Sequence, residues 1–190
     1  MRITLIKPNL RYLNDIYAVY SSPKVVKYLA VRRHATKLDT LRDIRKRIKD
    51  WHEKKRFNYM IKVRKTGSII GYLSVTISGH RANIGYAINQ EYWGQGYCSE
   101  SIRIIVKRLL KRKIRRIWAT VDPENKTSIR TLIRNGFKKE AILRDWEILP
   151  NISPLPRNAI SFIYSGKRHD GEGSCRHLPP SLFCIDRGHR

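Results

Sequence analysis

The sequence predicts an α/β domain built around a mixed sheet. Apolar residues recur at helical spacing in two segments near the N-terminus, the pattern then changes to short apolar runs separated by turns, and helical and strand patterns alternate from there onward. With 190 residues, the chain is long enough to bury one core. The predicted order of elements is α, α, β, β, β, α, β, α, β, β, which is typical of an α/β fold.

Two amphipathic helices are expected first. In residues 10–20, apolar side chains return on one helical face until Pro23 interrupts the pattern. In residues 41–51, apolar side chains follow at steps of three, four and three within an otherwise charged stretch. Both segments therefore predict a helix with one buried face.

Three strands are expected next, and they span residues 57–63, 69–77 and 82–88. Short polar turns join them, and the turns contain Gly67 and Gly79, where the backbone must reverse. Tight connections of this kind predict an antiparallel meander.

The second half of the chain alternates helices and strands. A glycine-containing loop leads into a helix with apolar positions from Ile102 to Leu110 and a basic opposite face. The further predicted elements are a strand over 115–121, a helix over 128–135, and strands over 137–148 and 159–164. From Ser165 onward the periodicity is lost, so the domain is expected to span residues 1–165 and residues 166–190 to form a mostly disordered tail.

The charge of the chain predicts an anionic partner. Forty Lys and Arg against fifteen Asp and Glu give a net charge of +25. No apolar run approaches the roughly 18 residues of a membrane span, and the N-terminus lacks the pattern of a secretory signal. Three widely spaced cysteines, with no zinc-ligand spacing, favour a reducing compartment and no metal. We therefore expect a cytoplasmic protein with no membrane partner.

The segment WGQGYC lies where a strand leads into a helix. Glycines at such a junction let backbone N–H groups surround a phosphate, and the helix dipole adds to the attraction. A tight turn that needs two glycines explains the same residues without any ligand. The loop alone leaves both interpretations open.

Two sequence motifs, which follow one another along the chain, together resemble a known family. The segments INQEYWGQGYCSE and VDPENKTSIRTLIRNGFKKEAILRD resemble the GCN5-related N-acetyltransferase (GNAT) superfamily, and within it the branch of ribosomal-protein N-terminal acetyltransferases. The cofactor loop of this family has the form Q/R-x-x-G-x-G/A, and here Trp93, Gly96 and Cys98 occupy the defined positions. Trp93 and Cys98 depart from that form. The resemblance covers roughly residues 1–165.

The resemblance implies a GNAT fold, with a central, mixed and largely antiparallel sheet flanked by helices and splayed strands that form the acetyl-CoA cleft. The strand ending near Ile88 would hold the pantetheine arm and polarise the thioester carbonyl through its backbone. Asn125 matches a position that hydrogen-bonds the cofactor arm, although it is equally suited to cap a helix. Backbone groups of one loop would cradle the pyrophosphate, and they belong to Gly94, Gln95, Gly96, Tyr97, Cys98 and Ser99.

The resemblance also implies two catalytic roles. Ser128 would protonate the leaving sulfur, and Glu147 would act as a general base through a water molecule. Each has a structural alternative, because Ser128 suits a helix cap and a strand glutamate is usually solvated. Tyr86, Tyr92 and Tyr97 are interpreted mainly as core or cleft wall. A covalent intermediate on Cys98 is disfavoured, because this family reacts by direct attack.

The implied function is an acetyl-CoA-dependent N-acetyltransferase whose acceptor is a protein N-terminal α-amine, with ribosomal proteins as candidates. A small-molecule amine is one alternative acceptor, because one cofactor site serves many acceptor pockets in this superfamily. A catalytically silent, basic ribosome- or RNA-binding module on the same fold is the alternative from another class.

The basic face of the helix after the loop has three explanations. Arg103 could help to hold the polyanionic cofactor. The remaining charges, together with those around residues 45 and 54, could dock the enzyme on ribosomal RNA through phosphate contacts. A basic composition throughout the lineage, without function, explains them equally well.

Overall fold

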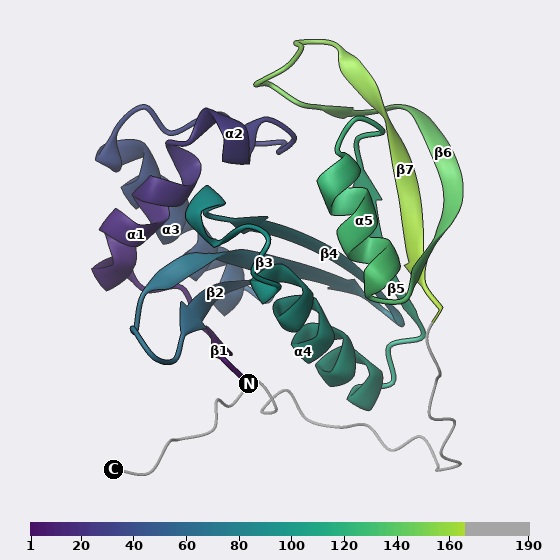
Figure 1. The fold of residues 1–190 in the computed structure, drawn as a ribbon, viewed down its shortest axis with the longest axis horizontal. Helices are drawn as coiled ribbons and strands as arrows, with labels where there is room; N and C mark the ends of the chain where they lie inside the picture. Colours follow the sequence, from purple (N-terminus) through teal and green to yellow (C-terminus); the bar gives the residue numbers. More distant parts are fainter. Residues whose placement is uncertain (166–190) are drawn as a thin grey trace.

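The computed structural model describes residues 1–165, which form one seven-stranded sheet flanked by helices (Figure 1). The order of strands across the sheet is β1-β2-β3-β4-β5-β7-β6. Only β4 and β5 pair in parallel, and every other neighbouring pair is antiparallel. The prediction of an α/β fold with a mixed, largely antiparallel sheet is confirmed. The tail, residues 166–190, lies outside the described residues.

The strands are β1 (Ile3–Ile6), β2 (Phe57–Val63), β3 (Ile69–Ser78), β4 (Arg81–Ile88), β5 (Arg116–Val121), β6 (Phe137–Ile148) and β7 (Pro156–Tyr164). The α-helices are α1 (Leu13–Tyr20), α2 (Pro23–Val26), α3 (Lys37–His52), α4 (Tyr97–Lys111) and α5 (Lys126–Arg134). Two 3-10 turns, Leu10–Tyr12 and Gln90–Tyr92, complete the described part. None of the helices in residues 1–165 combines the length and apolar character of a membrane span.

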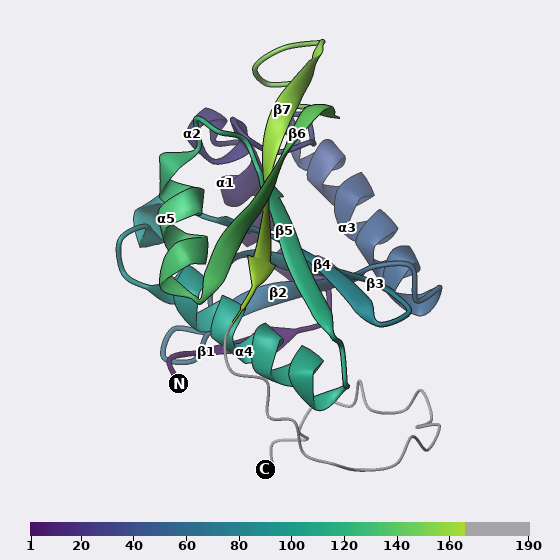
Figure 2. The ribbon, with the colours of Figure 1, turned by 90° about the vertical axis from the view of Figure 1, so that its right-hand side faces the viewer.

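The helices form a layer on each face of the sheet. Apolar residues of α1 and α3, such as Ile16 and Ile44, pack with Met60 and Tyr72 on one face. On the other face, α4 contributes Ile102 to a larger core that also contains residues of β5 and α5. Figure 2 shows α5 on one side of β6 and β7 and α3 on the other. Alternate residues of each central strand therefore face different cores.

The sheet opens between β4 and β5. Their parallel pairing is limited to Arg81–Asn83 against Arg116–Trp118, after which the two strands diverge. Residues 84–88 of β4 continue to pair with β3 but have no strand partner on their other edge. Backbone N–H and C=O groups along this edge are therefore available to a ligand.

Two elements differ from the sequence predictions. The short edge strand β1 was not predicted, and it pairs with β2 through Ile3–Ile6. The helix expected in residues 10–20 ends at Tyr20, before Pro23, but the short helix α2 was not predicted; Pro23 begins it, where proline is favoured because the first helical N–H needs no partner. The predicted meander of 57–63, 69–77 and 82–88 is present as β2, β3 and β4.

Candidate active site

The glycine loop presents an uncapped helix N-terminus. Gly94 and Gly96 have φ values of 75° and 80°, a left-handed backbone that other residues rarely adopt. Gly96 directly precedes α4, and no side chain caps the first turn of this helix. The loop of residues 94–99 therefore aims free backbone N–H groups and the positive end of a helix dipole at one place, which suits a pyrophosphate.

The structure brings Arg2 to this loop. The Arg2 guanidinium donates a hydrogen bond to the Gln95 carbonyl at 3.0 Å and lies 4.4 Å from the centre of the Tyr97 ring. It also forms a 3.1 Å ion pair with Glu100, which is buried. Burial opposes ionisation of Glu100, but hydrogen bonds from the backbone and side chain of Arg2 lower its pKa. Sequence reasoning missed Arg2, because 98 residues separate it from Glu100.

Trp93 fixes the start of the loop to the end of β4. Its indole Nε1 donates to the carbonyl of Ile88 at 2.7 Å. The structure thus places Ile88 beside the loop with its carbonyl already bonded, and the β4 residues that line the adjoining cavity are 83–87. The tryptophan that departs from the family form has a structural role here, and Cys98 lies in the first turn of α4.

A cavity of about 250 Å³ passes through the sheet where β4 and β5 diverge. Tyr20, Arg47 and Tyr72 line it from the face covered by α1 and α3. Asn125 and Ser128, which begin α5, line it from the opposite face. Two ligands that enter from opposite faces can therefore meet inside this cavity, which we call the central cavity.

Three predicted residues lie around the central cavity. Asn125 caps α5, because its Oδ1 accepts a hydrogen bond from the Ser128 backbone N–H at 3.1 Å, while its amide nitrogen remains available to a ligand. The Ser128 hydroxyl is 2.8 Å from the Tyr86 hydroxyl. Burial raises the pKa of Tyr86, so this phenol stays protonated and can donate to Ser128. Tyr86 is thus a partner of Ser128 and not merely cleft wall.

Glu147 is the third predicted residue at the central cavity. It is half-buried on β6, and no hydrogen bond or ion pair engages its carboxylate within residues 1–165. Burial raises the pKa of Glu147, and the charge of Arg56 opposes this shift only in part. A carboxylate with a raised pKa and a free oxygen is suited to accept a proton.

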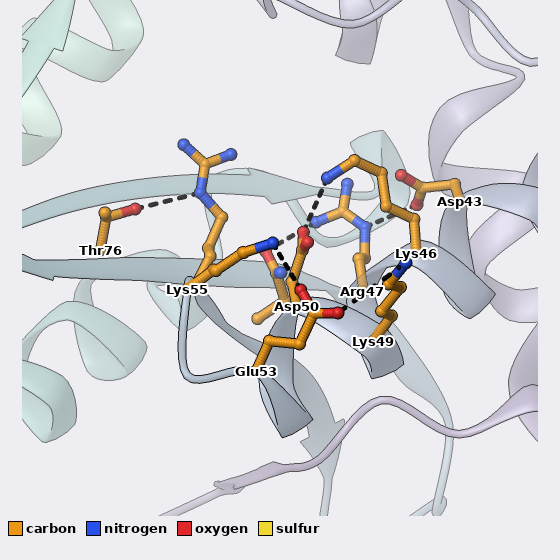
Figure 3. Close-up of polar contacts among 10 residues, drawn as sticks. Asp43, Lys46, Arg47, Lys49, Asp50, Glu53, Lys55 and Thr76 are labelled. Carbon is orange, nitrogen blue, oxygen red and sulfur yellow. Dashed lines mark hydrogen bonds and ion pairs between the residues drawn. The ribbon is translucent and has the colours of Figure 1, made fainter.

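The other carboxylates near the cavity are already paired. Asp122, buried at the end of β5, accepts from Arg157 at 2.7 Å. Figure 3 shows two pairs within α3, in which Arg47 is turned toward Asp43 and Lys46 toward Asp50. Just after the helix, Glu53 is paired with Lys49 and Lys55. Because the carboxylates of α3 form ion pairs with basic residues of the same helix, α3 presents no unpaired carboxylate to the cavity.

Cys98 is not poised for covalent chemistry. Burial raises the pKa of its thiol to about 12, so the nucleophilic thiolate is not formed near neutral pH. Tyr92 and Tyr97 pack edge to face with their ring centres 5.9 Å apart. Within residues 1–165, no three His, Cys, Asp or Glu side chains gather as a metal site would require.

A sheet that opens beside a glycine loop, with a cavity lined from both faces, is the arrangement of a transferase that can bring two substrates together. Residues 2–138 match the family model described as an acetyltransferase (GNAT) domain. The chain therefore belongs to the GNAT family of N-acetyltransferases, whose acetyl donor is acetyl-CoA. Its uncapped glycine loop and unpaired β4 edge are compatible with that donor.

Comparison with relatives supports this assignment. The chain is 32% identical to the uncharacterized N-acetyltransferase p20 of Bacillus licheniformis, over 77% of this chain and 84% of that protein. A shorter match, 33% identical over 73 residues and 38% of each chain, is to the [ribosomal protein uS5]-alanine N-acetyltransferase of Escherichia coli. The predicted family is thus confirmed.

Solved structures share the fold. The microcin C7 self-immunity acetyltransferase MccE, in complex with acetyl-CoA and AMP, has a TM-score of 0.76 and 24% identity, covering 85% of this chain and 91% of that chain. RimL, a ribosomal L7/L12 α-N-protein acetyltransferase, has a TM-score of 0.75 and 18% identity, covering 86% and 90%. These likenesses show that the chain shares the fold of these acetyltransferases.

Proposed function

We propose that the chain transfers the acetyl group of acetyl-CoA to the N-terminal α-amine of a protein, with ribosomal proteins as the first candidates. The observation that carries this proposal is the charge of the central cavity. Arg56 lines it together with Arg47, whose charge is paired with Asp43, and Glu147 is its one carboxylate without a partner in the described part of the chain. A polyamine or aminoglycoside carries several positive charges and would need several free carboxylates.

An α-amine fits this cavity chemically. Its pKa is about 8, so a fraction is neutral at physiological pH and a single modest base is sufficient. The names of two similar proteins, a uS5-alanine N-acetyltransferase and the L7/L12 enzyme RimL, describe acceptors of this kind. These relatives support the proposed acceptor class.

In the proposed mechanism, Glu147 accepts the amine proton, through a water molecule, as the nitrogen attacks the thioester carbonyl. The C–N bond forms, and the unpaired backbone of residues 84–87 is placed to stabilise the oxyanion. As the C–S bond breaks, Ser128 donates its hydroxyl proton to the sulfur, while the Tyr86 hydroxyl donates a hydrogen bond to the Ser128 oxygen and keeps its own proton. The proton that Glu147 accepted then returns through water to the Ser128 oxygen, so that both residues regain their starting protonation states. The loop of residues 94–99 holds the pyrophosphate, and Asn125 holds the pantetheine arm.

The test is a panel of amines with saturating acetyl-CoA. It contains peptide amides that begin with Ser or Ala, the same peptides with blocked N-termini, spermidine and an aminoglycoside. We expect acetylation of the free peptides, with mass spectrometry locating the acetyl group on the α-nitrogen. Activity confined to spermidine or the aminoglycoside would overturn the proposal. No affinity for acetyl-CoA, together with RNA binding that depends steeply on salt, would instead favour a silent RNA-binding module.

We further propose that the enzyme works in the cytoplasm and contacts the ribosome through a basic surface. The exposed face of α4 carries Arg103, Lys107 and Lys111, which exceed what one cofactor requires. The net charge of +25 supports attraction to ribosomal RNA. Arg103, near the start of α4, also remains a candidate to neutralise the phosphates of acetyl-CoA.

A further inference from the structure

A second cavity, of about 400 Å³, lies beside the central cavity on the face of the sheet that carries α1 and α3. We call it the tryptophan groove and define it by Trp118, Leu143 and Trp146, with Arg81, Asn83 and Ser161 at its edges. Asn83 also lines the central cavity, so the two cavities adjoin at this residue.

Helices leave this part of the sheet uncovered. The helices α1 and α3 pack over β2 and β3, whereas α5 covers the opposite face of β6 and β7 (Figure 2). Trp146 is consequently 51% exposed, and Trp118 and Leu143 are partly exposed. Two tryptophans that share an open concavity are costly to leave in water and favour a binding site.

A bulge in β6 aims neighbouring side chains at both cavities. The register of β6 with β7 shifts between Leu143 and Glu147, and Asp145 has a left-handed φ of 45°. Side chains of adjacent strand residues normally point to opposite faces, and a bulge breaks that alternation. Because of the bulge, Leu143 and Trp146 both line the tryptophan groove although they are three residues apart. Glu147, the next residue, lines the central cavity.

The charges of the tryptophan groove are positive. Its one carboxylate among the described lining residues, Glu140, is neutralised by an ion pair with Arg116 and a hydrogen bond from Ser161. Arg81 is exposed and forms no ion pair within residues 1–165. Arg56 reaches the rim, where it donates to the Thr76 hydroxyl at 3.1 Å. The groove thus fits an occupant with apolar and acidic groups.

We propose that the tryptophan groove binds the segment of the acceptor polypeptide that follows the acetylated N-terminus. This inference rests on the proposed function, and it names the part of the acceptor that the enzyme recognises. Apolar acceptor side chains pack on Trp118 and Trp146, and acidic ones pair with Arg81 and Arg56. The distance along β5 from Thr120 at the central cavity to Arg116 in the groove is about 13 Å, or about four extended residues.

The length of the groove determines how long the test peptides must be. One is an octapeptide amide that begins with Ala and carries alternating Phe and Asp at positions 3 to 6. The second replaces both Asp residues with Asn, and the third is a tripeptide amide with the same first two residues. The variants are Trp146→Ala and Arg81→Ala in the full chain. Ile142→Ala is the matched control, because Ile142 is an exposed apolar residue of the same strand that lines neither cavity.

We expect the wild-type KM of the octapeptide to be about tenfold below that of the tripeptide, with similar kcat. Trp146→Ala should raise the octapeptide KM about tenfold and leave the tripeptide KM unchanged, whereas Ile142→Ala should change neither. Arg81→Ala should raise the KM of the Asp octapeptide more than that of the Asn octapeptide. Unchanged acetyl-CoA affinity in each variant establishes that it is folded.

Equal KM values for long and short peptides, or equal effects of Trp146→Ala on both, would overturn the groove assignment while leaving the proposed function intact. Failure to acetylate even the tripeptide would overturn the proposed function and the groove together. Two further results assign the groove to another occupant and overturn the proposal. One is a single-stranded RNA that displaces the octapeptide and loses affinity in Trp146→Ala, and the other is a dimer that Trp146→Ala dissociates.

Discussion

Glu147 has an environment that changes its proton affinity. Its carboxylate is half-buried, lines the central cavity and is free of ion pairs in the described part of the chain, so burial raises its pKa. The proposed base must be ionised to accept a proton, so activity should fall as pH drops through this raised pKa. The nearby charge of Arg56 opposes this shift in part.

For Glu147→Gln, we expect kcat/KM to fall about a hundredfold near neutral pH, because the amide cannot accept the amine proton. The wild-type pH profile should rise through one ionisation above the ordinary glutamate range, and the variant should lack it and keep only the ionisation of the amine. The measurement is kcat/KM against pH with a peptide acceptor.

Glu53→Gln provides the control, because Glu53 follows α3 and lies outside the central cavity. Its profile should match that of the wild type. A Glu147→Gln profile that retains the acidic limb would show that another group is the base.

At the scale of elements, the junction of β4, the glycine loop and α4 is the candidate donor site. Gly96 has a φ of 80°, and an added Cβ would lie 3.4 Å from the Arg2 guanidinium. A larger side chain there both strains the backbone and obstructs the approach of a phosphate to the N–H groups. The loop rather than any single side chain is thus expected to control acetyl-CoA affinity.

We expect Gly96→Val to lower acetyl-CoA affinity at least tenfold from a micromolar wild-type value of roughly −8 kcal/mol, as measured by calorimetry. Gly79→Val is the matched control, because Gly79 also has a positive φ, of 56°, but lies in the hairpin between β3 and β4. It imposes similar backbone strain far from the loop and should leave the affinity unchanged. Equal losses in both variants would contradict a specific phosphate site.

The sequence predicts elements better where their pattern is local. The bounds of β2 and β6 agree with the strands predicted over residues 57–63 and 137–148. The strand β1 escapes prediction because its four residues are too few to show a period, and the pairing that stabilises it comes from β2. Pro23 does follow the end of α1, as the sequence predicts, but the four-residue helix α2 that it begins is too short to show a period.

The candidate site likewise contains residues that local motifs indicate and residues that only the fold brings together. The residues of the loop and of the segment after β5 lie in local motifs, and the sequence alone was sufficient to select them. The Tyr86–Ser128 hydrogen bond joins residues 42 positions apart, and the Arg2 contacts span even more. Such partners leave no local pattern, since only the folded sheet brings them together.

At the scale of the whole molecule, charge is the dominant feature. The exposed face of α4 gathers several cations, whereas the acidic residues of α3 are paired with cations of α3 or the turn that follows it (Figure 3). A concentrated cationic face should bind phosphates more strongly than an evenly basic surface, and its binding should depend steeply on salt.

We expect the double variant Lys107→Glu with Lys111→Glu to bind single-stranded RNA more weakly and with a smaller salt dependence than the wild type. Fluorescence anisotropy over a salt series measures both quantities. The control reverses two exposed lysines outside α4, Lys24 and Lys65, and should have a smaller effect. Equal losses in the two double variants would attribute RNA binding to overall composition rather than to α4.

The opening between β4 and β5 also has a kinetic consequence. Because residues from both faces of the sheet line the central cavity, we expect the donor and the acceptor to use separate routes of entry and exit. We therefore expect either substrate to be able to bind first, and the reaction to require both substrates at once. The partly opened sheet is thus expected to determine where the chemistry occurs without fixing the order in which the substrates bind.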